Sequence, residues 1–179
     1  MAVCFRSFSR RLTTYSELSQ ALSEFCSRAA EKLRHQHSVT GCISIFIRTS
    51  PFNPQEPHYE RSATLKLTAA TQDTRTLITA ANCLLTEIFR VGYNYQKCGV
   101  QLSHIQPATT PGQCELFEFA DDSLPTENRP LMATLDQINQ RFPKKLSIAA
   151  TGTDKSWQPK TERISQRYTT DWKELVWVK

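Results

Sequence analysis

The sequence predicts an α+β domain in which two helices cover one face of a four-stranded sheet, followed by a small α/β extension. Two segments carry apolar residues at helical spacing, and strand-like segments lie before, between and after them. An acidic stretch with prolines separates this part from a short C-terminal part. The resulting order is β-α-β-β-α-β. Two helices with one apolar stripe each can cover only one face of such a sheet.

The first strand and the first helix are expected at residues 3–13 and 15–35. The strand segment mixes aromatic, strand-forming and basic residues. Thr14 and Glu17 form the T-x-x-E pattern of a capping box, which opens a helix. Apolar residues then recur at helical spacing, namely Leu18, Ala21, Leu22, Phe25, Ala29 and Leu33.

The two middle strands are expected at 39–49 and 61–69, on either side of a loop with three prolines. Both segments alternate between apolar and polar residues, as half-buried strands do. The inward residues are Val39, Ile43, Ile45 and Ile47 in the first and Ala63, Leu65 and Leu67 in the second.

The second helix is predicted over 74–91, and the last strand over 95–105. Asp73 is a suitable N-cap, and Gly92 is a suitable residue to end the helix. In the last strand Cys98, Val100 and Leu102 share one face, and polar residues share the other.

The uncovered face of this sheet is polar, and two interpretations of it stay open. It is either the solvated face common in antiparallel sheets or a surface that follows the backbone of a nucleic-acid duplex. An RNA-binding sheet of the same strand order would need stacking aromatics on this face. Only Phe46 and one phenylalanine of the first strand are candidates for that role.

Composition is that of an ordinary globular protein with a basic N-terminal part. The 179 residues have a net charge of +5, and residues 1–110 carry 12 lysines and arginines against 7 acidic residues. This charge favours a polyanionic partner, although many proteins that never meet nucleic acid have a similar charge. The sequence has no apolar run long enough for a membrane span and no secretory signal. No two of the six cysteines form a C-x-x-C pair, so we expect reduced thiols in a cytoplasmic protein.

The linker, residues 109–128, contains an adjacent Leu116–Phe117 pair among carboxylates, with Gln113 just ahead. An extended segment of this kind can insert two apolar side chains into a cleft of a partner, while the Gln113 amide fixes the register. The alternative is that the pair folds back onto its own domain.

The C-terminal part, residues 129–179, is predicted to contain a helix that begins near Pro130, and a short strand and turn over 146–152. The helix carries apolar residues at i, i+4, i+7 and i+11, namely Leu131, Leu135, Ile138 and Phe142. Trp157, Tyr168, Trp172 and Trp177 then form a dense aromatic set. They either pack on themselves or on the first domain, or they form a docking surface for a partner.

No catalytic, metal or cofactor site is expected. His35 and His37 lie at a helix end without a third ligand, and Asp121 and Asp122 lie in a linker without a scaffold.

Five short motifs carry a resemblance that covers nearly the whole chain. In order they are CFRSFSRR, IFIRTSPF, TQDTRTLITAA, GYNYQKCGVQL and ISQRYTTDWKEL. Together they resemble the C-terminal part of a Y-family translesion DNA polymerase, of the UmuC/MucB-like type found in DNA polymerase V. The resemblance implies a little-finger domain at 1–108, a linker with a clamp-binding motif at 109–128 and a small extension at 129–179. The catalytic palm of the family, which holds Mg²⁺, has no counterpart in this sequence.

The resemblance implies a non-catalytic chain that grips primer-template DNA through the open sheet face. The positions that match the DNA-contacting strands are Arg6, Ser7, Ser9, Arg10, Arg48, Ser62, Thr64, Lys66, Lys97, Gly99 and Gln101. Gln113, Leu116 and Phe117 resemble the pentapeptide by which bacterial polymerases bind the β sliding clamp, although the family usually has Leu where Cys114 stands. For this type of subunit, the UmuD′ dimer and the RecA filament are further implied partners. The competing hypothesis is a protein-interaction module that binds no DNA.

Overall fold

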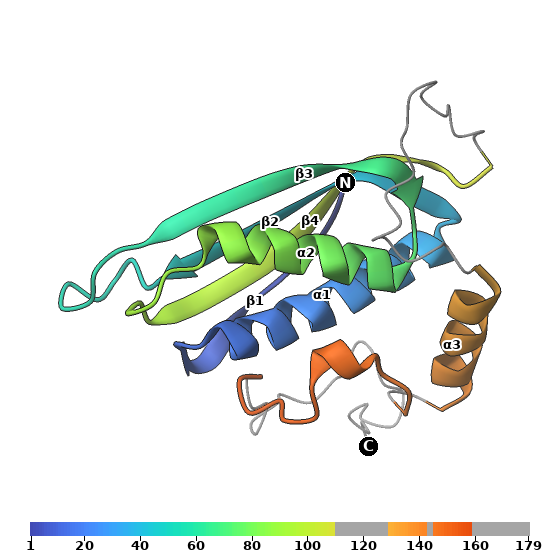
Figure 1. Cartoon of the computed structure of the whole chain (residues 1–179). Helices are drawn as coiled ribbons and strands as arrows, with labels where there is room; N and C mark the ends of the chain where they lie inside the picture. Colours follow the sequence, from blue (N-terminus) through green and yellow to red (C-terminus); the bar gives the residue numbers. More distant parts are fainter. Residues whose placement is uncertain (110–128, 143–144, 159–179) are drawn as a thin grey trace, which may run out of the picture.

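The computed structural model describes residues 1–109, 129–142 and 145–158, and Figure 1 shows their arrangement. The elements are β1 (Ala2–Leu12), α1 (Tyr15–His35), β2 (Ser38–Thr49), β3 (Glu60–Thr71), α2 (Thr74–Ile88), β4 (Tyr95–Pro107), α3 (Arg129–Arg141) and the 3₁₀ helix η1 (Ala149–Thr151). The four strands form one sheet in the order β1-β4-β2-β3, and all neighbours are antiparallel. The predicted β-α-β-β-α-β fold is therefore confirmed.

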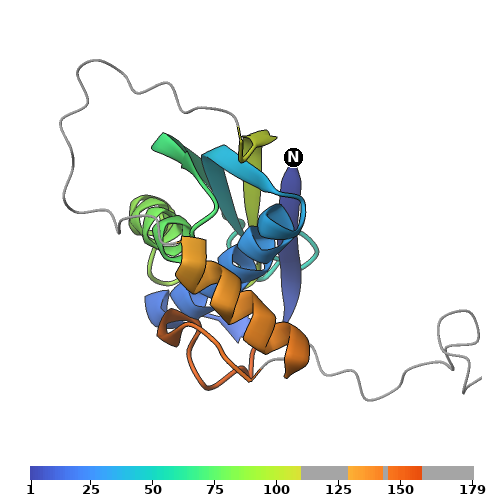
Figure 2. The same cartoon turned by 90° about the vertical axis from the view of Figure 1, so that its right-hand side faces the viewer.

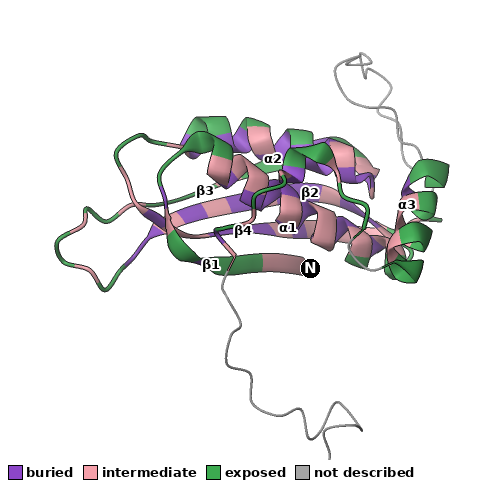
Figure 3. Cartoon of the chain, turned by 90° about the horizontal axis from the view of Figure 1, so that it is seen from below, coloured by how far each residue is buried: buried purple, intermediate pink, exposed green. Residues whose placement is uncertain are grey.

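The helices α1 and α2 lie side by side on one face of the sheet (Figures 1 and 2). The inward residues Ile43, Ile45 and Val100 are at most 1% exposed, and the predicted stripe of α1 is buried against them. Figure 3 shows the buried residues gathered where the helices meet the strands. The hydrophobic core lies between these two layers, which leaves the opposite face of the sheet without a helix in the described part of the chain.

Both helices begin where the sequence predicts, but α2 ends three residues early. Both hydrogen bonds of the capping box, between Thr14 and Glu17, are formed at the start of α1. The backbone of Phe89 is extended, with φ −67° and ψ 138°, so α2 stops at Ile88 rather than at residue 91. The Phe89 ring packs edge-on against Tyr15, with 5.6 Å between the ring centroids. The helix therefore ends before Gly92, at a residue whose ring packs against α1.

The C-terminal part contains the predicted helix, α3, but not the predicted strand. Residues 149–151 form the 3₁₀ helix η1, and no strand occurs over 146–152, so the strand part of this expectation is wrong. The Thr151 hydroxyl donates to the main-chain oxygen of Ile148 at 2.8 Å, and Gly152 follows with a φ of 67°. These local features close a tight turn that an extended strand cannot contain.

Trp157 joins the C-terminal part to the core of the first domain. Its side chain is 2% exposed and meets the rings of Phe8 and Phe25 edge-on, at centroid distances of 5.9 and 5.8 Å. The Ser9 amide donates to the Trp157 carbonyl at 3.1 Å. For Trp157, packing on the first domain is therefore confirmed. Tyr168, Trp172 and Trp177 lie outside the described residues.

Two ion pairs also hold this part against α1. Arg34 donates twice to the carboxylate of Asp136 on α3, at 2.6 and 2.8 Å, and both side chains are largely buried. Lys155 donates to Glu24 at 2.7 Å. Burial alone would raise the pKa of Glu24, but hydrogen bonds from Lys155 and Arg28 outweigh burial and hold the pKa below its ordinary value. Figure 2 shows α3 and residues 145–158 beside α1, on the helix side of the molecule.

Three further findings concern the cysteines, the helices and the metal-ligating side chains. The five described cysteines, Cys4, Cys26, Cys42, Cys83 and Cys98, are free thiols. None of the described helices is long and apolar enough to cross a membrane. Among residues 1–109, 129–142 and 145–158 there is no group of three or more metal-ligating side chains.

Candidate nucleic-acid interface

The register of the strands determines which side chains share the open face. Residues directly opposite each other on neighbouring strands point to the same face of a sheet. Phe5 is opposite Gly99, Gly99 is opposite Phe46, and Phe46 is opposite Ser62. These four residues form one row across the sheet, which we call the ring row. The neighbouring rows are two residues away along each strand.

The row on one side of the ring row is charged, and we call it the basic row. Ser7, Lys97, Arg48 and Glu60 follow one another across the four strands. Lys66 lies at the other end of the face, opposite Cys42. Within the described part of the chain, neither Arg48 nor either lysine makes an ion pair. The three cations are thus available for an external anion.

Hydroxyl and amide groups lie between these cations. The row on the other side of the ring row, away from the basic row, contains Val3, Gln101, Ser44 and Thr64. The Ser44 and Thr64 hydroxyls are 2.8 Å apart and share a hydrogen bond. Seven of the residues predicted from the sequence therefore share the open face: Ser7, Arg48, Ser62, Thr64, Lys66, Lys97 and Gln101.

Gly99 is also on this face, but it is buried beneath two rings. A Cβ atom at this position would lie 2.5 Å from Cε1 of Phe46 and 2.5 Å from Cβ of Phe5. The rings fill the space that an approaching backbone would need. In this structure Gly99 has a packing role, and its expected contact with DNA stays a prediction.

Arg6 lies on the opposite side of the sheet from the open face. Its neighbours on the strand, Phe5 and Ser7, point to the open face, and successive side chains of a strand alternate. Arg6 lines a cleft of about 540 Å³ with Glu24 and Arg28 of α1. The open sheet face that was expected to include Arg6 therefore does not include it.

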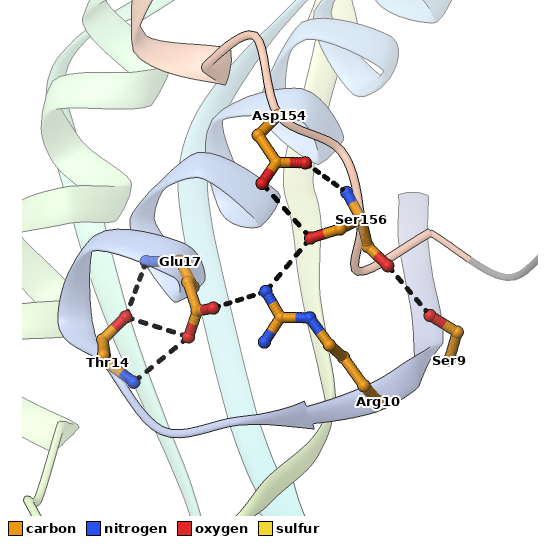
Figure 4. A network of polar contacts seen from close by, with 6 residues as sticks. All are labelled: Ser9, Arg10, Thr14, Glu17, Asp154 and Ser156. Carbon is orange, nitrogen blue, oxygen red and sulfur yellow. Dashed lines mark hydrogen bonds and ion pairs between the residues drawn. The ribbon is translucent and has the colours of Figure 1, made fainter.

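Ser9 and Arg10 contact the C-terminal part, as Figure 4 shows. The pairing of β1 with β4 is irregular between Ser7 and Leu12, so the rows defined above do not extend to Ser9 and Arg10. The Ser9 hydroxyl donates to the Ser156 carbonyl at 3.1 Å. Arg10 donates to Glu17 at 2.6 Å and to the Ser156 hydroxyl at 3.1 Å. In the structure both predicted residues thus contact the C-terminal part.

The same network affects Glu17. Burial would raise the pKa of this carboxyl group, but hydrogen bonds from Arg10 and Thr14 outweigh burial and lower the pKa. Glu17 is therefore ionised at neutral pH and holds Arg10 at the junction of β1 and α1. The positive charge of Arg10 is partly neutralised there, which distinguishes it from the cations of the open face.

Phe5 is the residue of the open face that the sequence leaves undetermined. The first strand contains two phenylalanines, and its polar and apolar residues do not alternate cleanly. Phe8 is buried against Trp157, whereas Phe5 is 50% exposed on the open face. Because the segment does not alternate between apolar and polar residues, the sequence does not show which of the two phenylalanines is buried and which is exposed. The clamp-like motif, with Gln113, Leu116 and Phe117, lies outside the described residues.

This geometry defines the class of the protein: it is a sheet domain with a layer of helices on one face and an open, basic face on the other. The model of the impB/mucB/samB family C-terminal domain matches residues 2–116. The chain therefore belongs to the impB/mucB/samB family. A second model, described as a domain of unknown function (DUF4113), matches residues 129–178.

Curated relatives resemble nearly the whole chain. Protein MucB of Salmonella typhimurium is 42% identical over 173 residues, which are 97% of this chain and 40% of the relative. Protein UmuC of Salmonella typhimurium strain LT2 is 41% identical over 178 residues, which are 99% of this chain and 42% of the relative. The resemblance to the UmuC/MucB type is therefore confirmed, and the chain spans about two fifths of the length of these relatives.

Among solved structures, the insertion ternary complex of Dbh DNA polymerase contains a similar part. The match has a TM-score of 0.49 and 14% sequence identity, and it covers 59% of this chain and 28% of that one.

Proposed function

We propose that this chain is the non-catalytic C-terminal portion of an error-prone translesion DNA polymerase, and that it grips primer-template DNA. Membership of the impB/mucB/samB family and similarity to MucB and UmuC support the polymerase context. The observation that carries the DNA grip is the open face, on which Arg48, Lys66 and Lys97 have no ion-pair partner among the described residues. The proposed division is a little-finger domain at 1–108, a linker at 109–128 and an extension at 129–179.

The spacing of the cations suits the two backbones of a duplex. Arg48 and Cys42, which is opposite Lys66, are six residues apart on β2, or about 20 Å in an extended strand. The major groove of B-DNA is about 12 Å wide, so cations at the two ends of this face can reach phosphates on both sides of it. Hydroxyl groups between them, such as Thr64, can donate to phosphate or sugar oxygens. Contacts of this kind respond to shape and charge, which suits an enzyme that works on distorted templates.

Salt dependence tests this grip. Each phosphate contact contributes about 0.9 to the slope of log affinity against log salt concentration for duplex DNA. We expect the single variants Arg48→Glu, Lys66→Glu and Lys97→Glu each to weaken binding and to lower that slope by about 0.9. Lys145→Glu makes the same change in charge on an exposed residue of the extension and is the matched control. Equal slopes for all four variants and the parent would contradict the proposal.

A second part of the proposal concerns the sliding clamp. Gln113, Leu116 and Phe117 would bind it as an extended segment, with the two apolar side chains in a cleft of the clamp. Burial of the two side chains is worth on the order of 3–5 kcal/mol before the cost of ordering the linker. A double variant, Leu116→Ala with Phe117→Ala, should lose clamp binding in a pull-down or surface-binding assay and should keep its affinity for DNA. Unchanged clamp affinity would refute this part.

The wider context is proposed from the same family. The parent enzyme would act in SOS DNA repair in the bacterial cytoplasm, with catalysis and Mg²⁺ in the palm of the whole polymerase. The UmuD′ dimer and the RecA filament are proposed partners of the extension, without assignment to residues.

The alternative is a protein-interaction module, and one observation favours it. Ile138, Phe142 and Leu146 of the C-terminal part are 38%, 52% and 42% exposed. Exposed apolar residues that lie close together often mark protein interfaces. Absence of binding to primer-template DNA at low salt would favour this alternative, because phosphate contacts are strongest there.

A further inference from the structure

Two aromatic rings meet on the open face above Gly99. The centroids of Phe5 and Phe46 are 6.3 Å apart, and the rings are tilted by 58°. Gly99 between them permits this contact, since a side chain there would collide with the ring of Phe46 and with Cβ of Phe5. Phe46 is half-buried, whereas Phe5 is 50% exposed. The sheet thus presents an aromatic ring to solvent at a position where most of its neighbours are polar.

One cation contacts this ring, and a second lies on the same face. The Nζ atom of Lys97 lies 4.2 Å from the centroid of Phe5, which is the geometry of a cation–π contact. Arg48 is opposite Lys97 on the neighbouring strand. The basic row and the ring row are two residues apart along the strands, or about 7 Å, within the reach of long side chains. On the other side of the ring row, Gln101 adds an amide that can donate or accept hydrogen bonds.

We propose that Phe5 and Lys97 form a stacking site for an unpaired base of single-stranded DNA. An aromatic ring beside cations is the combination that binds single strands without sequence preference, because every base has a π-face and every nucleotide has a phosphate. The base would stack on the exposed ring of Phe5, and Lys97 would turn from the ring to the phosphate of the same nucleotide. Arg48 would hold the next phosphate.

This site adds a substrate class to the proposed function, and it rests on the proposal that nucleic acid binds to the open face. Duplex contacts use the phosphates and need no exposed ring. A stacking ring instead selects unpaired nucleotides, which duplex DNA does not offer. The substrate class of the open face would then include single-stranded DNA next to a duplex, and the contacts with Phe5 would differ from the phosphate contacts of Lys66.

The experiment compares two DNA probes with the full chain. Phe5→Ala should lower the affinity for a short dT oligonucleotide by about tenfold in fluorescence anisotropy, in line with the loss of one base stack. Affinity for a blunt duplex should change less than about twofold, because its contacts are with phosphates. Phe52→Ala is the matched control: Phe52 is 92% exposed in the loop between β2 and β3, away from the ring row, and its loss should change neither affinity.

Two further variants separate stacking from packing. Phe5→Leu keeps an apolar side chain against Phe46 but has no π-face, so it should behave like Phe5→Ala with the dT probe. Phe5→Tyr keeps the π-face and should bind like the parent. If Phe5→Leu binds dT as well as the parent, or if Phe5→Ala weakens both probes equally, the stacking site is refuted. If the parent binds duplex but not dT, the inference fails alone; if it binds neither at low salt, the proposed function fails as well.

Discussion

The anchoring of the C-terminal part by Trp157 allows one prediction to be worked out in detail. The indole is 2% exposed and is packed between Phe8 and Phe25. Replacement of a buried tryptophan by alanine removes its transfer free energy and leaves a cavity, which together cost about 3–5 kcal/mol. We therefore expect Trp157→Ala to lower the free energy of unfolding by about this amount, up to the free energy with which residues 129–158 dock.

The nitrogen of the indole refines this expectation. Nε1 of Trp157 is buried and has no hydrogen-bond partner among the described residues. A buried donor without a partner costs about 1–3 kcal/mol. Trp157→Phe removes that donor and keeps an aromatic ring in the same site, so we expect its loss of stability to be about 1 kcal/mol or less. The loss in free energy of unfolding should therefore be much larger for Trp157→Ala than for Trp157→Phe, although both variants lack the indole.

Urea unfolding followed by circular dichroism measures the free energy of unfolding of both variants. An equal slope of this free energy against urea concentration shows that both expose the same surface on unfolding. Truncation after residue 128 sets the limit, because it removes Trp157 and its contacts with Phe8 and Phe25. Phe142→Ala, at a residue that is 52% exposed, is the control and should change stability by about 0.5 kcal/mol or less. A truncation that costs several kcal/mol, together with a Trp157→Ala variant that costs almost nothing, would refute the anchoring role.

Three further predictions concern packing and charge. Because the folded pKa of Glu24 lies below its ordinary value of 4.5, its pairing with Lys155 stabilises docking fully above that pH and is lost as the pH falls through the folded pKa. Proteolysis of the C-terminal part should rise in that acid window, and Glu24→Gln should flatten this dependence. Gly99→Ala should cost about 1–3 kcal/mol in thermal or urea unfolding, because its Cβ would overlap the ring of Phe46 and Cβ of Phe5; an unchanged stability would contradict the packing role. Arg34→Ala should cost about 3–5 kcal/mol or undock α3, because Asp136 is left largely buried without its partner; hydrogen exchange in α3 should detect it, and unaltered protection would argue against it.

The sequence predicts most of the first domain because its patterns are local. The stripe of α1 and its capping box lie within one segment, and so do the alternating residues of β2 and β4. The end of α2 escaped prediction because Phe89 is held in an extended conformation by rings from α1 and β4. The strand expected over 146–152 was wrong because a short apolar run does not distinguish a strand from a turn of helix.

The candidate site was predictable on the strands whose alternation is clear. Arg48 and Lys97 follow from the phase of β2 and β4, which buried residues on either side determine. The first strand offers no such phase, because polar, basic and aromatic residues occur on both of its faces. Arg6 therefore lies on the helix side, against expectation, and Phe5 emerges as a residue of the open face. The pairing of β1 with β4 shows which side chains of β1 lie on the open face, and the pattern of apolar residues does not.

The position of the C-terminal part has a consequence for the proposed DNA grip. Docking of residues 129–158 on the open face would have been incompatible with DNA there, because the two would compete for the same cations. Instead, Trp157 lies in the core and Asp136 binds Arg34 of α1, so the described residues of the extension lie on the helix side. The two faces of the sheet domain can then act separately. Variants such as Trp157→Ala should therefore weaken docking without changing the salt slope of DNA binding, whereas Lys66→Glu should do the reverse.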